Sequence, residues 1–221
     1  MLNSLEMDGL LFPSCLPFRY DQPDLRLVHQ IRDDLWKACM NSMRYMGNLN
    51  VSIYDHLILC VLISENTELM ELLGLSHLNH QDYLWLRVLV LLHDLHEGIT
   101  GDICYPMKQR IKLCTNIISE IEDGWEFCIR ASYMVEEPTP DMKQAMKRID
   151  NAAVIIEVVN SIGATLTAAA EERLSHIHGA TPALINFAKK NNMIQRIQNN
   201  RQMCSALKSD VIGEYLASRD Y

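Results

Sequence analysis

The chain changes from apolar to polar within residues 84–97, which read LWLRVLVLLHDLHE. The apolar part, residues 84–92, contains Arg87 and is far shorter than the roughly 20 residues that a membrane-spanning helix needs. It therefore predicts a buried helix in a globular protein, and no association with a membrane. An imidazole and carboxyl groups at the end of such a helix are costly unless other groups satisfy them. The same stretch therefore also predicts a polar site.

Helical spacing continues on both sides of this stretch. Apolar residues recur every three or four positions from Leu25 to Met43, and Ser52 followed by Asp55 resembles a capping box. No alternating strand pattern accompanies these helices, so we expect an all-α fold in a single domain, residues 1–221. The expected helices cover about residues 22–46, 52–73, 79–97, 107–135, 141–174, 182 onward and 203–217.

Polar caps and helix breakers predict where these helices begin and end. We expect Asp21, Asp141 and Thr181 to stand at helix N-termini. Two glycines, Gly124 and Gly163, predict irregularities inside long helices. Residues 98–106 contain two glycines and a proline, and therefore predict a loop.

Composition and charge exclude several classes of protein. The chain has 221 residues, of which 48% are hydrophobic and 22% charged, as in ordinary globular proteins. A chain of this length can bury roughly 70% of its unfolded surface, so it needs no disulfide or metal to fold. The formal net charge is −8, from 20 basic and 28 acidic residues. Such an acidic chain is a poor binder of a nucleic-acid polymer.

The cysteines predict a reducing environment. The chain has seven of them, an odd number, and none is arranged as Cys-x-x-Cys. This pattern favours free thiols in the cytoplasm over a disulfide framework or a thiolate zinc site.

The polar end of the quoted stretch has the spacing of a metal site. His93 and Glu97 are four residues apart and Asp94 and Glu97 three apart, so a continuous helix would place all three near one face. Nitrogen and carboxylate ligands suit divalent first-row ions and Mg²⁺. The alternative is a structural helix end whose polar residues meet solvent, and spacing alone leaves both interpretations open.

A longer motif contains these residues. It consists of His-Asp, a Glu three positions after the Asp, then Gly-Asp and Pro-x-Lys. Its positions are filled by His93, Asp94, Glu97, Gly101, Asp102, Pro106 and Lys108. The motif resembles the HD superfamily of metal-dependent phosphohydrolases, and within it the branch of bacterial 5′-deoxynucleotidases and phage deoxynucleoside triphosphatases. The resemblance covers about residues 44–157 and implies an HD-type helical bundle, with residues 175–221 as a C-terminal helical extension.

The resemblance implies one divalent metal ion, either Co, Mn, Mg or Zn, held by His56, His93, Asp94 and Asp150. Without it, His56 would be interpreted as a histidine of a capped helix and Asp150 as a solvated acid. The resemblance assigns catalysis to Glu97, which would orient or deprotonate water or protonate the leaving oxygen, and to Asp94 through its place among the ligands.

The loop after Glu97 is implied to bind the sugar and phosphate of a substrate. Asp102 would accept a hydrogen bond from the sugar 3′-hydroxyl, Ile103 and Tyr105 would line that wall, and Lys108 would face phosphate. Cys104 and Tyr105 depart from the usual residues of the family, so Tyr105 would either narrow the pocket, stack on a base or simply pack.

A second departure concerns Arg44 and Tyr45, which stand closer to His56 than the Arg-aromatic pair of the family stands to its histidine. One interpretation is that Arg44 binds phosphate and Tyr45 stacks on the base of a nucleotide. The other is that the two residues only end a helix.

The implied function is removal of phosphate from the 5′ position of small deoxynucleotides, as a monophosphate nucleotidase or a triphosphate hydrolase. The alternatives are hydrolysis of another phosphorylated metabolite or alarmone, and a catalytically silent helical protein that binds nucleotides. The expected partners are a small nucleotide and further copies of the chain in a homo-oligomer.

Overall fold

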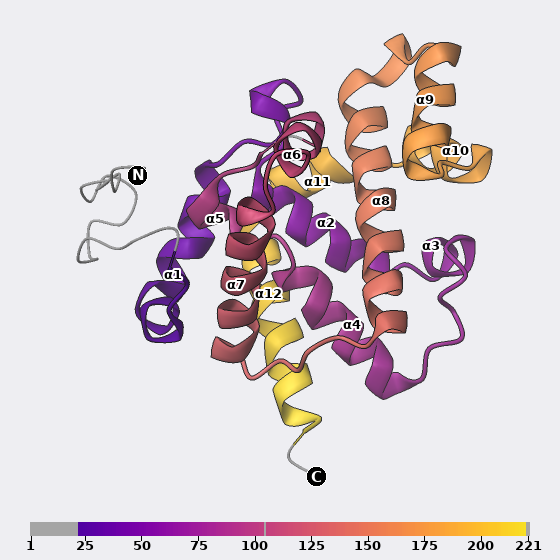
Figure 1. Cartoon of the computed structure of the whole chain (residues 1–221). Helices are drawn as coiled ribbons and strands as arrows, with labels where there is room; N and C mark the ends of the chain where they lie inside the picture. Colours follow the sequence, from indigo (N-terminus) through magenta and orange to yellow (C-terminus); the bar gives the residue numbers. More distant parts are fainter. Residues whose placement is uncertain (1–21, 104, 220–221) are drawn as a thin grey trace.

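Helices form most of the computed structural model, which describes residues 22–103 and 105–219 (Figure 1). The α-helices are α1 (Leu25–Asn41), α2 (Ile53–Glu65), α3 (Thr67–Leu72), α4 (His80–Leu92), α5 (Glu97–Thr100), α6 (Tyr105–Lys112), α7 (Ile117–Ser132), α8 (Pro140–Ile162), α9 (Ala168–His178), α10 (Pro182–Lys190), α11 (Met193–Asn199) and α12 (Arg201–Ala217), with short 3₁₀ turns η1 (Tyr45–Gly47) and η2 (Gly163–Thr165). Within these residues there is no β-sheet, only an isolated bridge between Met43 and Ser52. The predicted all-α fold is confirmed.

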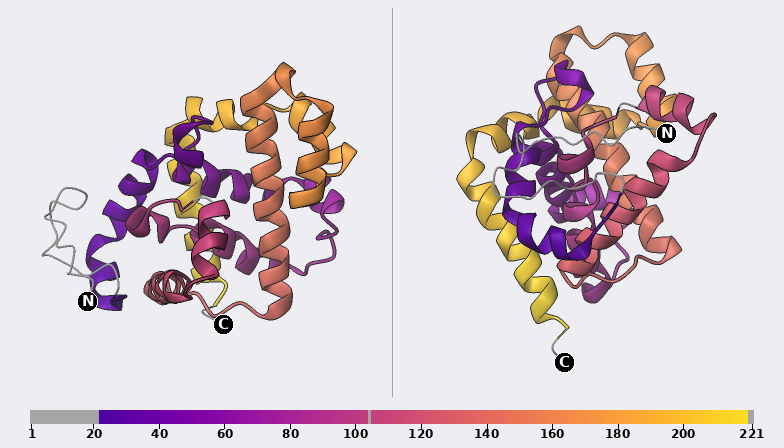
Figure 2. Two further views of the ribbon diagram at one scale, coloured as in Figure 1. Left: turned by 45° about the horizontal axis from the view of Figure 1, so that its top comes forward. Right: turned by 60° about the vertical axis from the view of Figure 1, so that its left-hand side comes forward.

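Helix α2 is the centre of the fold. Eleven of its 13 residues are buried, so it has no solvent face and must be covered on every side. Helices α4 and α8 pack against α2 and against each other, while α1 and α11 cover other parts of its surface. The three central helices lie together in each view (Figures 1 and 2). Side chains that point into the space between α2, α4 and α8 therefore lie among tightly packed helices.

Polar caps begin several helices where the sequence indicates them. The capping box of Ser52 and Asp55 is present at the start of α2. The predicted cap at Thr181 is confirmed, since its side chain accepts from the backbone of Leu184. The prediction for Asp141 is wrong, because Thr139 caps α8 and Pro140 takes the first helical position, where a missing N–H costs nothing. Asp21 lies outside the described residues.

Several predicted helices are divided in the structure. Residues 52–73 form two helices because the Asn66 side chain caps α3. Residues 107–135 are interrupted at 113–116, not at Gly124, which packs against Pro23. The irregularity at Gly163 is confirmed, since the backbone there has a φ of 57° that ends α8. The predicted helix over 79–97 is also wrong at its end, because α4 stops at Leu92 and turns follow.

The C-terminal helices pack onto the central ones. Helix α10 contacts α8, α11 contacts both α2 and α8, and α12 lies along α4. The α12 contact includes a buried arginine of α4, Arg87, which pairs with Glu65 and Glu214. The predicted helices did not separate α11 from its neighbours, although Asn192, which caps it, was a signal that could have done so. Among the described helices, none has the length and apolar character needed to cross a bilayer.

Helix α5 lies close against α1, and a glycine makes this approach possible. A Cβ atom at Gly98 would stand 3.0 Å from the Cys39 sulfur and 3.1 Å from the Leu35 carbonyl oxygen. The backbone oxygen cannot move aside without disturbing α1. The contact therefore fixes the position of Glu97, the residue before Gly98.

We expect Gly98→Ala to destabilise the protein by about 1–3 kcal/mol, because the methyl group overpacks the contact between α5 and α1. The matched control is Gly213→Ala on the exposed side of α12, where a Cβ atom meets nothing within 4 Å. That change should stabilise the helix by about 0.5–1 kcal/mol. Urea unfolding of the two variants measures both values, and equal stabilities would contradict the close approach.

Candidate metal centre

Four side chains from three parts of the chain meet between α2, α4 and α8. They are His56 of α2, His93 and Asp94 directly after α4, and Asp150 of α8, and their ligand atoms all lie within 4.8 Å of one another. The two Nε2 atoms of the histidines are 3.3 Å apart. His56 Nε2 is 3.5 Å from Asp150 Oδ1, and His93 Nε2 is 3.4 Å from Asp94 Oδ2. These four residues could hold a metal ion.

Local structure explains how each ligand is placed. The capping box fixes the first turn of α2, in which His56 is fully buried. The end of α4 at Leu92 lets the chain turn, so that both His93 and Asp94 face the centre. Asp150 lies in the middle of α8, where Lys147 Nζ contacts its outer oxygen at 2.7 Å. The ligands thus come from two rigid helices and one fixed turn.

Hydrogen bonds to the other ring nitrogens orient both imidazoles. His56 Nδ1 is 2.6 Å from Glu157 Oε1, and His93 Nδ1 is 2.9 Å from the Val90 carbonyl oxygen. In neutral imidazoles whose Nδ1 atoms donate, the two Nε2 atoms present lone pairs to each other, and a bound cation relieves this unfavourable contact. Two nitrogens bound to one ion at about 2.0–2.1 Å would be roughly 3–3.4 Å apart, as found here. The donor set and its spacing therefore fit a metal ion.

The charges of the cluster also require a positive charge at its centre. Burial lowers the pKa of both imidazoles, but nearby carboxylates outweigh this effect. For His56, burial and Arg44 lower the pKa, but Cys60, Glu157 and Asp150 together raise it well above its ordinary value. Asp94 and Asp150 raise the pKa of His93 to about 10. Burial raises the pKa of the two aspartates, yet the imidazoles hold it below the ordinary range. The cluster therefore needs positive charge between its carboxylates, from protons or from a cation.

Glu157 supports the centre and was not among the predicted site residues. Its side chain is fully buried and contacts His56, the hydroxyl of Tyr45 at 2.6 Å and the guanidinium of Arg44 at 3.6 Å. It stands two turns after Asp150 on α8, so both point to the same side of the helix. An acid within the apolar run AAVIIEVV was the signal that could have identified it.

Arg44 and Tyr45 both reach the centre. Arg44 Nη1 is 3.1 Å from Asp94 Oδ2, and its guanidinium lies over the Tyr45 ring at 5.4 Å. The Tyr45 hydroxyl donates to Glu157, and its backbone N–H donates to Asp102 Oδ2 at 3.0 Å. In this structure the two residues hold the acids of the centre in place.

Glu97 begins α5 and is only 3% exposed. Lys108 Nζ is 3.5 Å from its Oε1, and Arg44 Nη1 is 3.8 Å from its Oε2. Burial, and next the charge of Asp94, raise the pKa of Glu97 to about 8, although Arg44 opposes the shift. A buried carboxyl that holds its proton near neutral pH can act as an acid.

The remaining predicted residues lie around the loop after α5. Asp102 and Ile103 are half-buried, and Lys108 of α6 bridges Glu97 and Glu122. Cys104 lies outside the described residues, and so does the side chain of Tyr105, whose backbone begins α6.

A polar cavity of about 570 Å³ opens beside the centre. His93, Asp94 and Asp150 form part of its wall. Helices α6, α7 and α8 add four cationic side chains, Lys108, Arg130, Lys143 and Lys147, together with acidic ones. The volume is within the range of about 300–1,000 Å³ that is usual for small-molecule sites.

No protein-family model, curated protein or solved structure matches the chain. The resemblance drawn from residues 93–108 therefore stays a prediction.

We expect Mn²⁺ or Co²⁺ to raise the thermal unfolding midpoint, because an ion that binds only the folded state adds about 2.7 kcal/mol at 100 times its Kd. Asp150→Asn should abolish this increase by removing a ligand. His77→Ala, which changes an exposed histidine, should retain it. Differential scanning fluorimetry with and without metal provides the comparison, and an equal increase in all three proteins would exclude the centre as the binding site.

Glu157→Gln removes the carboxylate that orients His56, and we expect metal binding about 10- to 100-fold weaker. Tyr45→Phe removes only one hydrogen bond to Glu157 and should weaken binding less. Isothermal titration calorimetry with Mn²⁺ measures both effects. Undiminished affinity in Glu157→Gln would show that the contact is structural only.

Proposed function

We propose that this protein is a metal-dependent phosphohydrolase of the HD type, which removes phosphate from the 5′ position of small deoxynucleotides. The observation that carries the proposal is the meeting of His56, His93, Asp94 and Asp150 next to a buried acid, Glu97, at the edge of a polar cavity. A module that only binds a ligand has no need of that acid.

The four ligands would hold one divalent cation. Two nitrogens and two carboxylate oxygens suit Mn²⁺, Co²⁺ or Zn²⁺, and tolerate Mg²⁺. Such a cation supplies the Lewis acidity that phosphate-ester hydrolysis requires. The chain contributes the rest, since Glu157 and Val90 orient the two imidazoles and Arg44 orients Asp94.

In the proposed reaction, Glu97 would be the proton donor. It is held between Lys108 and Arg44, and burial favours its protonated form at neutral pH. In the proposed reaction it donates this proton to the leaving oxygen of the ester. Lys108 would orient this carboxyl and face the anionic substrate.

The cavity suits a small anion better than a polymer. Its lysines and arginine come from three helices and stand among acidic side chains, such as Glu122 and Glu137, so they form no continuous basic surface. The chain as a whole carries a charge of −8. A mobile nucleotide can reach local cations that a nucleic-acid backbone, with its many phosphates, could not use together.

The test is release of inorganic phosphate from the common deoxynucleoside and nucleoside mono- and triphosphates, with Mn²⁺ or Co²⁺ added. We expect metal-dependent turnover, and in Glu97→Gln a kcat lower by about 10²- to 10⁴-fold, because the general acid is lost. The control is Glu120→Gln, an exposed acid in the first turn of α7, which should keep full activity.

Two results would contradict the proposal. One is absence of turnover across the panel while the protein still binds metal, which would favour the catalytically silent nucleotide-binding protein. The other is full activity in Glu97→Gln. Turnover limited to another phosphorylated metabolite would keep the chemistry and correct the substrate.

A further inference from the structure

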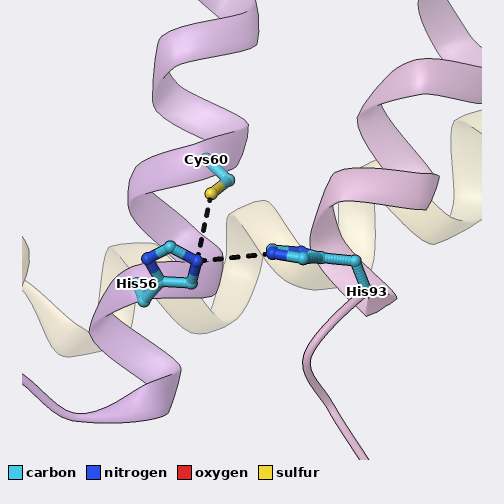
Figure 3. A group of neighbouring side chains, drawn as sticks. All are labelled: His56, Cys60 and His93. Atoms are coloured by element: carbon cyan, nitrogen blue, oxygen red, sulfur yellow. Dashed lines mark hydrogen bonds between the residues drawn. The ribbon is translucent and has the colours of Figure 1, made fainter. Parts of the chain in front are cut away.

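A cysteine sulfur, which is a soft metal ligand, lies beside the two histidines of the centre. Cys60 stands one turn after His56 on α2 and is completely buried. Its sulfur is 3.7 Å from His56 Nε2, and the ligand atoms of His56, Cys60 and His93 all lie within 4.8 Å of one another. Figure 3 shows the thiol directed at the ring nitrogen of His56 that also faces His93.

The direction of the thiol matters more than its burial. A buried cysteine usually behaves as a small apolar side chain and packs against other apolar groups. Here the sulfur meets the very nitrogen that already faces a second imidazole nitrogen at 3.3 Å. Three electron-pair donors thus converge on one point inside the protein.

Two nitrogens and one sulfur form a ligand set that thiophilic cations prefer. Zinc binds nitrogen at about 2.0–2.1 Å and thiolate sulfur at about 2.3 Å, which in a tetrahedral site separates N from S by roughly 3.5 Å. The Cys60–His56 distance of 3.7 Å is close to this value. On binding, the Cys60 thiol gives up its proton and a metal–sulfur bond forms, while the cation remains divalent.

The two donor sets overlap but are not the same. Both contain His56 and His93; one adds Cys60, and the other adds Asp94 and Asp150. Donors on opposite sides of a single ion are at most about 4.5 Å apart, given metal–ligand distances of about 2.0–2.3 Å. Because the thiol and the carboxylates belong to separate sets, an ion bonded to Cys60 lies on the sulfur side of the histidines. It then gives up carboxylate contact.

We propose that His56, Cys60 and His93 form a second metal-binding set for thiophilic divalent cations such as Zn²⁺ or Cd²⁺. Occupation of this set excludes the ion held by the histidines and aspartates, because both sets use the same two imidazoles. The proposal uses the centre on which the proposed function also rests, but it concerns which cation binds and where.

The first experiment is titration of the metal-free protein with Cd²⁺, followed by the ultraviolet charge-transfer absorption of a cadmium–thiolate bond. We expect one equivalent of Cd²⁺ to produce this band in the wild type, and the band to be lost in Cys60→Ser and Cys60→Ala. Cys114→Ser, which changes an exposed cysteine, is the matched control and should keep the band. Far-ultraviolet circular dichroism verifies that each variant remains helical.

The second experiment separates the two sets. Asp150→Asn should keep the cadmium–thiolate band and lose thermal stabilisation by Mn²⁺, whereas Cys60→Ser should lose the band and keep that stabilisation. Prior saturation with Cd²⁺ should prevent the Mn²⁺ effect in the wild type.

Three outcomes would overturn the proposal. They are a full band in both Cys60 variants, no band in a wild-type protein that Mn²⁺ stabilises, and loss of Mn²⁺ stabilisation in a Cys60→Ser protein that is still helical. If neither cation binds the wild type, the metal centre fails as well, and with it the proposed function.

Discussion

The contact between His56 Nδ1 and Glu157 Oε1, 2.6 Å long and fully buried, is the interaction on which the rest of the centre depends. It joins α2 to α8 and turns the imidazole so that its Nε2 faces His93. A buried carboxylate is costly unless it is paired, and Glu157 also contacts Tyr45 and Arg44. Neither central helix can shift without leaving a buried charge unpaired. The contact that fixes the packing of α2 against α8 therefore also fixes the orientation of the His56 ring in the centre.

This constraint brings together more acidic groups than nearby cations can neutralise. The carboxyls of Asp94, Glu97 and Glu157 surround a single guanidinium, that of Arg44, and Asp150 faces the imidazoles. Nearby negative charge raises the pKa of the imidazoles against the effect of burial, whereas burial, and next the charge of Asp94, raise the pKa of Glu97 to about 8. A divalent cation relieves the excess with a single group, whereas protons must be shared among several side chains.

Local signals predicted the helices and a polar site after the apolar run, whereas the resemblance, not local spacing, implied the set of four ligands. The contacts that join distant parts of the chain were not predicted. The capping box at Ser52 predicts the start of the helix that contains His56, and the end of the apolar run predicts a polar site at His93 and Asp94. His56 and Glu157 are 101 residues apart in the sequence, and helical periodicity carries no information about contacts between residues so far apart. The end of α4 at Leu92 was missed because a spacing of four up to Glu97 fits a continuous helix as well as a turn followed by a new helix. Helical periodicity was enough to predict the all-α fold. The hydrogen bonds that orient the ligands, such as that between His56 and Glu157, could be found only from the tertiary structure.

The two donor sets share His56 and His93, so the position that a cation takes would affect the proposed reaction. The wall of the cavity contains His93, Asp94 and Asp150, whereas Cys60 is completely buried. A hard cation drawn to the carboxylates would therefore lie on the cavity side, where the proposed substrate would bind. A soft cation drawn to the sulfur would lie on the buried side of the imidazoles, away from the proposed substrate. Since both positions need His56 and His93, the softness of the cation would decide whether the centre is open to substrate.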